Sequence, residues 1–165
     1  AFTDLLPMTD EMGEQCVETY RRLFNENNAL YVIPTFPNVM ETLHQLHEQG
    51  YTLTIASSRS NRSLMEFVND MHLNKVIPYV LGAEDVAHAK PHPDPVLQTL
   101  ESFNCKPEDA LVVGDTWYDI EMGRRAGVHT CGVTYGNGSR EELMRAGADF
   151  LVDDFGELMK LAGGK

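Results

Sequence analysis

The clearest fold signal in the sequence is the stretch Ala110-Leu111-Val112-Val113-Gly114-Asp115-Thr116-Trp117-Tyr118-Asp119. Its first four residues are all apolar, a pattern typical of a short parallel strand that is buried on both faces. Gly114 lets the backbone turn tightly out of this strand. Residues 116–126 then have the pattern of a helix, and Gly127 is a residue type that commonly ends one. We therefore predict a strand that leads into a helix, with Asp115 at the end of the strand.

The same alternation extends on both sides of this stretch. Apolar or β-rich runs cover residues 51–56, 76–81, 129–135 and 150–152, and segments with helical spacing separate them. Strands that alternate with helices of this length indicate βαβ units. We therefore predict an α/β fold, a Rossmann-like parallel sheet of about five strands with helices on both of its faces.

An amphipathic helix precedes this alternating pattern. From Met8 to Phe24 the apolar residues recur at helical spacing, and prolines at positions 34 and 37 then interrupt the chain. No low-complexity linker follows. We expect residues 1–30 to form a helical appendage and residues 31–165 to form the α/β domain.

Charge and apolar content exclude several classes of protein. The chain has 25 Asp and Glu against 13 Lys and Arg, a net charge of −12, which argues against nucleic-acid binding because that function needs a basic patch. No apolar run is long enough to cross a bilayer. The three cysteines are widely spaced and are typical of reduced thiols. We expect a cytoplasmic protein without nucleic-acid or membrane partners, whose oligomeric state the sequence leaves open.

Polar side chains follow the predicted strands at their carboxyl ends, where open parallel sheets bind ligands. Ser57 and Ser58 follow the first strand, Lys90 lies in the loop after the second, and Asp115 ends the third. Asp119 comes four residues after Asp115, so both carboxylates lie on one face if a helix begins between them. We expect these side chains to gather at one edge of the sheet.

Each of these groups has a functional and a structural interpretation. Two nearby carboxylates suit a hard cation such as Mg²⁺, although acids also cap helix N-termini. Lys90 lies in a loop stiffened by prolines and can hold a fixed charge against a phosphate, or it can be a solvated side chain. Ser57 and Ser58 can cradle phosphate oxygens or cap a helix. Arg59 can pair with an anionic substrate or be exposed.

Other patterns do not support a function. Gly136-Asn137-Gly138 begins like a dinucleotide-binding fingerprint, but Glu141 stands at the third glycine position. His44 and His47 lie three residues apart on a predicted helix without further zinc ligands nearby in sequence. We expect both histidines to lie on the surface and the cysteines not to act as nucleophiles.

Three segments occur in an order that resembles a known family. They are Thr54-Ile55-Ala56-Ser57-Ser58, Lys90-Pro91-His92-Pro93, and Gly114-Asp115-Thr116-Trp117-Tyr118-Asp119. They resemble the second, third and fourth motifs of the haloacid dehalogenase superfamily, in particular its phosphoglycolate phosphatase-like branch with a helical cap. The likeness extends over residues 34–158.

The resemblance implies a Mg²⁺-dependent phosphatase that hydrolyses a small phosphorylated metabolite through an aspartyl-phosphate. It implies that Ser57 hydrogen-bonds the transferring phosphoryl group and that Lys90 bridges this group to the nucleophilic aspartate. It further implies that Asp115 ligates Mg²⁺ and that Asp119 is a second ligand or orients the first.

One part of the family pattern is missing. The first motif of the family, Asp-x-Asp-Gly-Thr, carries the nucleophile and the general acid/base, and these 165 residues contain no Asp-x-Asp. Residues 1–30 resemble the last part of the helical cap, and residues 31–165 resemble a core without its first strand. We expect this chain to be inactive by itself; the alternative is a non-catalytic protein that keeps a phosphate and metal pocket.

Overall fold

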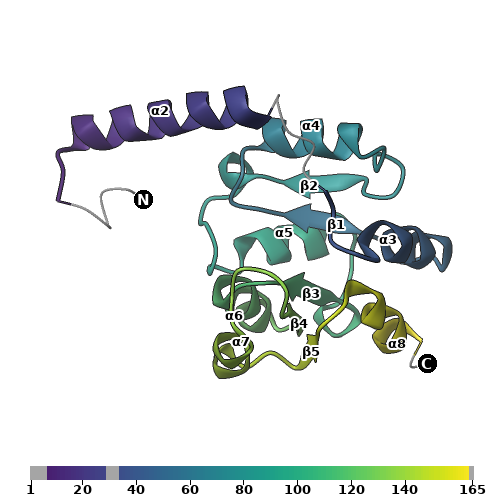
Figure 1. Ribbon diagram of the computed structural model, residues 1–165. Coiled ribbons are helices and arrows are strands. Elements are labelled where there is room, and N and C mark those ends of the chain that lie inside the picture. The colour runs from purple at the N-terminus through teal and green to yellow at the C-terminus, as the bar shows by residue number, and fades with distance from the viewer. Residues whose placement is uncertain (1–6, 29–33, 164–165) are drawn as a thin grey trace. The chain divides into compact units, whose positions relative to one another are not determined.

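The computed structural model describes residues 7–28 and 34–163, and the chain divides into two compact units (Figure 1). The first unit, Ala1–Thr35, contains the helix α2 (Asp10–Asn28). The hydroxyl of Thr9 accepts a hydrogen bond from the N–H of Met12 and so caps this helix. Residues 1–6 and 29–30 of the predicted appendage lie outside the described residues, and its interpretation as part of a cap stays a prediction.

The second unit, Phe36–Lys165, has an α/β fold whose strands are all parallel in the described residues, as predicted. The strands are β1 (Thr54–Ala56), β2 (Tyr79–Leu81), β3 (Leu111–Gly114), β4 (His129–Val133) and β5 (Phe150–Val152). They form two sheets rather than one, with the orders β1-β2 and β3-β4-β5. The edge strands β1 and β3 have no hydrogen-bonded ladder between them in the part of the chain that the structure describes.

A helix follows each of these strands. The helices of this unit are α3 (Val39–Glu48), α4 (Asn61–Asp70), α5 (Asp94–Ser102), α6 (Trp117–Ala126), α7 (Arg140–Ala146) and α8 (Leu158–Ala162), with short 3₁₀ turns η1 (Ala83–Asp85), η2 (Pro107–Asp109) and η3 (Phe155–Glu157). Helix α6 packs on β3 and β4, while α5 contacts both β1 and α6. Because α5 contacts a strand of the first sheet and the helix that packs on the second, it joins the two parts of the unit (Figure 1).

The second strand is shorter than its apolar run predicts. The pattern indicates a strand over residues 76–81, but β2 begins only at Tyr79. The N–H groups of Val76 and Ile77 both donate to the carbonyl of Leu73, at 2.9 and 2.8 Å, and form a turn. Both side chains are buried in that turn, so the apolar run reflects burial and not strand structure alone.

The core consists of three apolar clusters. One lies around α5 and α6, a second around α4 and the turn before β2, and a third around β4, β5 and α8. Their buried members are Val96, Leu100, Met122, Ala126 and Val128; Val68, Leu73, Val76 and Ile77; and Cys131, Val133, Val152 and Leu158. Each cluster packs helices against strands, or against the turn that precedes a strand.

None of the helices within residues 7–28 and 34–163 combines the length and the apolar character that a membrane span requires.

Candidate active site

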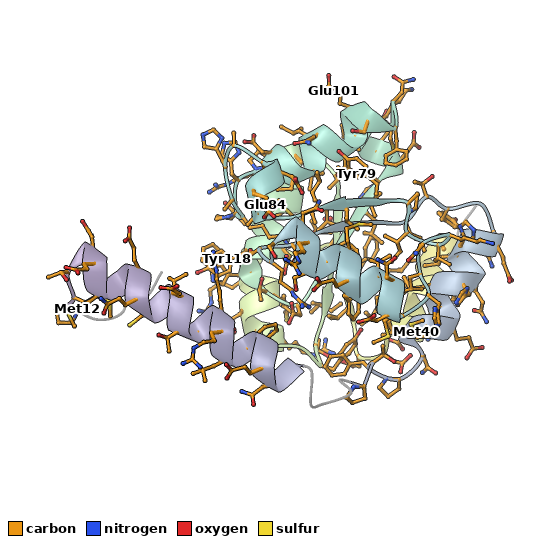
Figure 2. All side chains as sticks on the ribbon, turned by 90° about the horizontal axis from the view of Figure 1, so that it is seen from above. Met12, Met40, Tyr79, Glu84, Glu101 and Tyr118 are labelled. Carbon is orange, nitrogen blue, oxygen red and sulfur yellow. The ribbon has the colours of Figure 1, made fainter. Side chains whose placement is uncertain are left out.

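A cleft of about 370 Å³ lies at the carboxyl ends of β1 and β3. It is lined by Ser57, Ser58, Lys90, Asp115, Thr116, Tyr118 and Asp119, of which Tyr118 is labelled in Figure 2. The structure therefore brings together every candidate that the sequence predicted except Arg59. Thr116 and Tyr118 are additional lining residues, which the sequence analysis did not single out.

Ser57 directly follows β1. Its N–H donates to the carbonyl of Leu81 at 2.9 Å, which extends the pairing of β1 with β2 by one residue. Its hydroxyl oxygen accepts a hydrogen bond from the N–H of Arg59 at 3.2 Å. Because the oxygen is the acceptor there, the hydroxyl proton of Ser57 can be donated to a ligand in the cleft.

The side chain of Arg59 does not line the cleft, unlike the neighbouring Ser57 and Ser58. Its guanidinium donates to the hydroxyl of Ser63, on α4, at 2.7 Å. Arg59 is exposed, which agrees with the simpler of the two interpretations of its sequence position. The structure thus leaves this arginine outside the cleft lining.

Lys90 and Asp119 form an ion pair beside the cleft. The Nζ atom of Lys90 lies 2.7 Å from Oδ1 of Asp119, and the two side chains are only 16% and 10% exposed. The other carboxylate oxygen, Oδ2, accepts hydrogen bonds from the N–H and the hydroxyl of Thr116, at 3.1 and 2.7 Å. Asp119 therefore caps the start of α6 with one oxygen and holds Lys90 with the other.

Asp115 is held by the loop that follows β4. The backbone N–H and the side-chain Nδ2 of Asn137 each donate to Oδ2 of Asp115 at 2.8 Å. The N–H of Gly138 donates to the backbone carbonyl of Asp115, also at 2.8 Å. Within residues 7–28 and 34–163, the side-chain hydrogen bonds to Asp115 all go to Oδ2, so Oδ1 stays available for a cation.

Glycines allow this loop to approach the acid. A Cβ atom on Gly136 would lie 2.2 Å from Cβ of Asp115, and one on Gly138 would lie 2.5 Å from the Asp115 carbonyl oxygen. Gly136-Asn137-Gly138 matches a dinucleotide-binding fingerprint only in part, and this supporting role was not predicted from the sequence. The available signal was the position of Asn137 after β4, because β3 and β4 are paired and their carboxyl ends meet.

The residues of the cleft fit a magnesium ion at Asp115. Mg²⁺ prefers hard oxygen ligands and is usually held by one or two carboxylates together with waters and phosphate oxygens. Asp115 offers such an oxygen, whereas both oxygens of Asp119 already accept hydrogen bonds. The donor set therefore suits an ion bound mainly by Asp115, with Asp119 beside it.

The cysteine thiols do not enter this chemistry. Burial raises the pKa of Cys131 to about 11, so its thiol stays protonated at neutral pH. Cys131 is fully buried in the cluster around β4, and neither it nor Cys105 lines the cleft. The reactive groups of the cleft are therefore oxygen and nitrogen groups.

This chain is similar in sequence to curated proteins. The chain is 32% identical over 153 residues to pyrophosphatase PpaX of Anoxybacillus flavithermus, an alignment that covers 93% of this chain and 71% of the relative. It is 31% identical over 148 residues to pyrophosphatase PpaX of Bacillus cereus, covering 90% of this chain and 68% of the relative.

Solved structures have the same fold. A predicted phosphoglycolate phosphatase from Haemophilus somnus superposes with a TM-score of 0.85 at 27% identity, covering 94% of this chain and 68% of that structure. A predicted phosphatase from Clostridium acetobutylicum gives a TM-score of 0.85 at 26% identity, covering 98% and 74%. The family model described as haloacid dehalogenase-like hydrolase matches residues 4–133. This chain belongs to the haloacid dehalogenase-like hydrolases.

Proposed function

We propose that this chain provides the phosphate-binding and metal-binding side of a phosphatase that hydrolyses a small phosphate monoester, phosphoglycolate-like, with Mg²⁺ as cofactor. The observation that carries the proposal is the ion pair of Lys90 with Asp119, held in the same cleft as Ser57 and Asp115. The hydroxyl of Ser57 and the ammonium of Lys90 can bind phosphoryl oxygens, and the carboxylate of Asp115 can hold the metal ion. This combination suits phosphate hydrolysis, because that reaction depends on stabilising the negative charge of the phosphoryl group. The kinship with pyrophosphatase PpaX supports a phosphatase activity in general.

Each residue has a distinct role in this proposal. The hydroxyl of Ser57 donates to a phosphoryl oxygen, and Ser58, which also lines the cleft, contributes to the same phosphate site. Lys90 supplies a positive charge, and Asp119 positions it. Asp115 holds Mg²⁺, which neutralises negative charge on the phosphoryl group when it is bound. Arg59 is a weaker candidate for substrate binding because its guanidinium bonds Ser63.

The nucleophile of this reaction is proposed to lie on a strand that this chain does not contain. We regard residues 31–165 as a core without its first strand, and residues 1–30 as the end of a cap. The supporting observation is that β1 and β3, two parallel edge strands, are not joined by a ladder in the described residues. A strand paired with both would end beside Ser57, Lys90 and Asp115 and can present an aspartate for an aspartyl-phosphate.

A second candidate function is non-catalytic binding of phosphate and metal. It is favoured by the engagement of both aspartates of the cleft, because Asp115 accepts from Asn137 and Asp119 pairs with Lys90. Neither carboxylate is therefore a free nucleophile in this arrangement. The two candidates differ in whether a strand with an Asp-x-Asp sequence completes the cleft.

The cysteines and the net charge of the chain support a small-molecule substrate in a reducing compartment. Cys16, Cys105 and Cys131 are free thiols, which supports the cytoplasm as the location. A net charge of −12 disfavours nucleic acid as a partner, and a small phosphorylated metabolite fits the size of the cleft.

Hydrolysis of p-nitrophenyl phosphate with Mg²⁺ tests the proposal. We expect no turnover by the 165-residue chain, and turnover by a longer form whose additional N-terminal strand contains Asp-x-Asp. Lys90→Ala and Asp115→Asn in the longer form should abolish it, while His44→Ala, on the exposed face of α3, should not. Inactivity of the longer form would favour the binding protein, and turnover by the short chain that is lost in Asp115→Asn would overturn the missing-nucleophile assignment.

A further inference from the structure

A second cluster of ligating groups lies in the loop between β2 and α5. The Nδ1 atom of His88 is 2.6 Å from Oδ2 of Asp94, and the Nδ1 atom of His92 is 2.9 Å from Oδ1 of the same carboxylate. The two imidazole rings lie 4.3 Å apart, centroid to centroid. In the part of the chain that the structure describes, this is the one group of three or more His, Cys, Asp or Glu residues whose ligand atoms all lie within 4.8 Å.

We propose that His88, His92 and Asp94 form a binding site for a divalent transition-metal ion, with Zn²⁺ as the best match. Two imidazole nitrogens and one carboxylate oxygen are a donor set that zinc, cobalt and nickel accept, whereas Mg²⁺ prefers oxygen ligands alone. None of the three residues lines the cleft that holds Asp115 and Lys90. The site is therefore distinct from the magnesium site, and it does not depend on the proposed phosphatase activity.

The distances suit an ion after a small expansion. Bonds of about 2.0–2.1 Å in a tetrahedral zinc site separate neighbouring ligand atoms by about 3.3 Å. The separation of His88 from the carboxylate, 2.6 Å, is that of a hydrogen bond. The Nδ1 atom of His92 lies 2.9 Å from the carboxylate and accepts a hydrogen bond from the N–H of Asp94 at 3.3 Å. An ion bound to both Nδ1 atoms takes the place of these two hydrogen bonds, and the three groups move apart by about half an ångström.

The loop already holds the three groups together. Prolines at positions 91, 93 and 95 alternate with two of the ligands and restrict the backbone. The N–H of His92 donates to the carbonyl of Ala89 at 3.0 Å, and Asp94 is the first residue of α5. Because the folded loop already holds the three ligands close together, little conformational entropy is lost when an ion binds.

Exposure leaves room for an ion to enter and for water to complete its coordination. The side chains of His88 and His92 are 64% and 42% exposed, whereas that of Asp94 is 26% exposed. A three-ligand site of this kind keeps at least one open coordination position. The carboxylate of Asp94 is the least exposed of the three ligands, and the two more exposed histidines leave a path for the ion from solvent.

The position of the cluster connects it to Lys90. His88 lies two residues before Lys90, and His92 lies two residues after it. An ion bound by both histidines joins the two flanks of Lys90, the residue that reaches across to Asp119. Metal binding would therefore stiffen the loop segment that presents this lysine to the cleft.

Titration of the untagged 165-residue protein with Co²⁺, followed by visible absorption, tests the proposal. Excess Mg²⁺ is present throughout so that it occupies the acidic site of the cleft. We expect one equivalent of Co²⁺ to bind with the absorption bands of nitrogen coordination, and Zn²⁺ to displace it. His88→Gln and His92→Gln should each weaken binding by about tenfold or more, since even the hydrogen-bonding partners of metal ligands contribute this much.

The control is the double variant His44→Gln and His47→Gln, which removes two exposed histidines from α3. It should bind Co²⁺ as the parent does, and Asp115→Asn should do so as well. Absence of stoichiometric binding, or binding that is unchanged in His88→Gln, would overturn the site. His88 is mostly exposed, so this variant folds even if His92→Gln does not, which circular dichroism checks.

Discussion

The ammonium of Lys90 lies 2.7 Å from a carboxylate oxygen of Asp119, and this contact joins the loop after β2 to the first turn of α6. The two residues are 29 positions apart in the sequence, and both side chains are largely withdrawn from solvent. A charge in such surroundings has lost much of its hydration, and the attraction of the opposite charge compensates for this loss. Each member of the pair therefore stabilises the other in its buried position. The pair thus fixes the position of the cleft's only lining cation among the described residues.

The first prediction concerns the energy of this pair. Lys90→Met should lower the free energy of unfolding by about 2 kcal/mol, because it leaves the Asp119 carboxylate partly buried without its cation. The double variant Lys90→Met and Asp119→Asn should lose less than the sum of the single variants. Urea denaturation of the four proteins in a double-mutant cycle measures this coupling.

The matched control is the exposed pair of Lys160 with Glu157, whose side chains are 77% and 39% exposed. Lys160→Met should cost less than about 1 kcal/mol, as expected for a solvent-screened pair. Equal losses at the two sites would mean that the Lys90 pair is no stronger than a surface contact.

The second prediction concerns Mg²⁺. A thermal melt of the parent chain should shift upward with Mg²⁺, because an ion that binds the folded state stabilises it. Asp115→Asn should remove this shift, since it removes the charge of the carboxylate whose Oδ1 is available. Asp119→Asn should weaken the shift, and Lys90→Ala should leave it intact or enlarge it by deleting a nearby positive charge. An unchanged Mg²⁺ response in Asp115→Asn would refute the metal assignment.

The third prediction concerns the loop around Asp115. Gly136→Ala places a Cβ atom 2.2 Å from Cβ of Asp115, so the loop must move away and Asn137 must lose its hydrogen bonds to the carboxylate. We expect a loss of about 1–3 kcal/mol in unfolding free energy and a weaker Mg²⁺ shift in the thermal melt.

Gly50→Ala provides the comparison for that variant. Gly50 has a φ of +88°, but an added Cβ there has no atom within 4 Å, so the cost is backbone strain alone. This variant should lose stability and keep the full Mg²⁺ shift. If Gly136→Ala also keeps the full shift, the loop does not support the metal-binding carboxylate.

The fourth prediction concerns acid stability. Hydrogen bonds from the backbone and side chain of Ser139 lower the pKa of Glu142. Ser139 caps α7, and Glu142 is the third residue of this helix. A carboxyl whose folded pKa is depressed stabilises the protein above its ordinary pKa, near pH 4, and loses this contribution as the pH falls through the folded value. Glu142→Gln should therefore flatten the decline of stability below about pH 4.

Urea denaturation at a series of pH values measures this decline. Glu141, the preceding residue, has the same charge, so Glu141→Gln controls for the change in net charge. A pH profile of Glu142→Gln that matches the profile of the Glu141→Gln control would show that the capping contact contributes nothing.

The local pattern of apolar and polar residues was enough to predict the fold class and most of the residues that line the cleft. Alternating apolar runs and helical spacings predict parallel strands, and parallel strands bring their carboxyl ends to one edge. For this reason Ser57, Lys90 and Asp115 could be grouped from their positions after three different strands. The confirmed α/β class and the shared lining of the cleft follow from the same periodicity.

Only the tertiary structure shows which side chains from distant segments form hydrogen bonds with each other. Nothing in the local sequence around Asp119 selects Lys90 as its partner over a metal ion, and nothing around Asn137 assigns it to Asp115. Residues 76 and 77 are apolar like a strand, yet they lie in a turn, because burial selects for apolar side chains whatever the backbone conformation. Periodicity records which side of an element is buried, whereas pairing and hydrogen bonding depend on which elements meet in space, and only the assembled fold determines that.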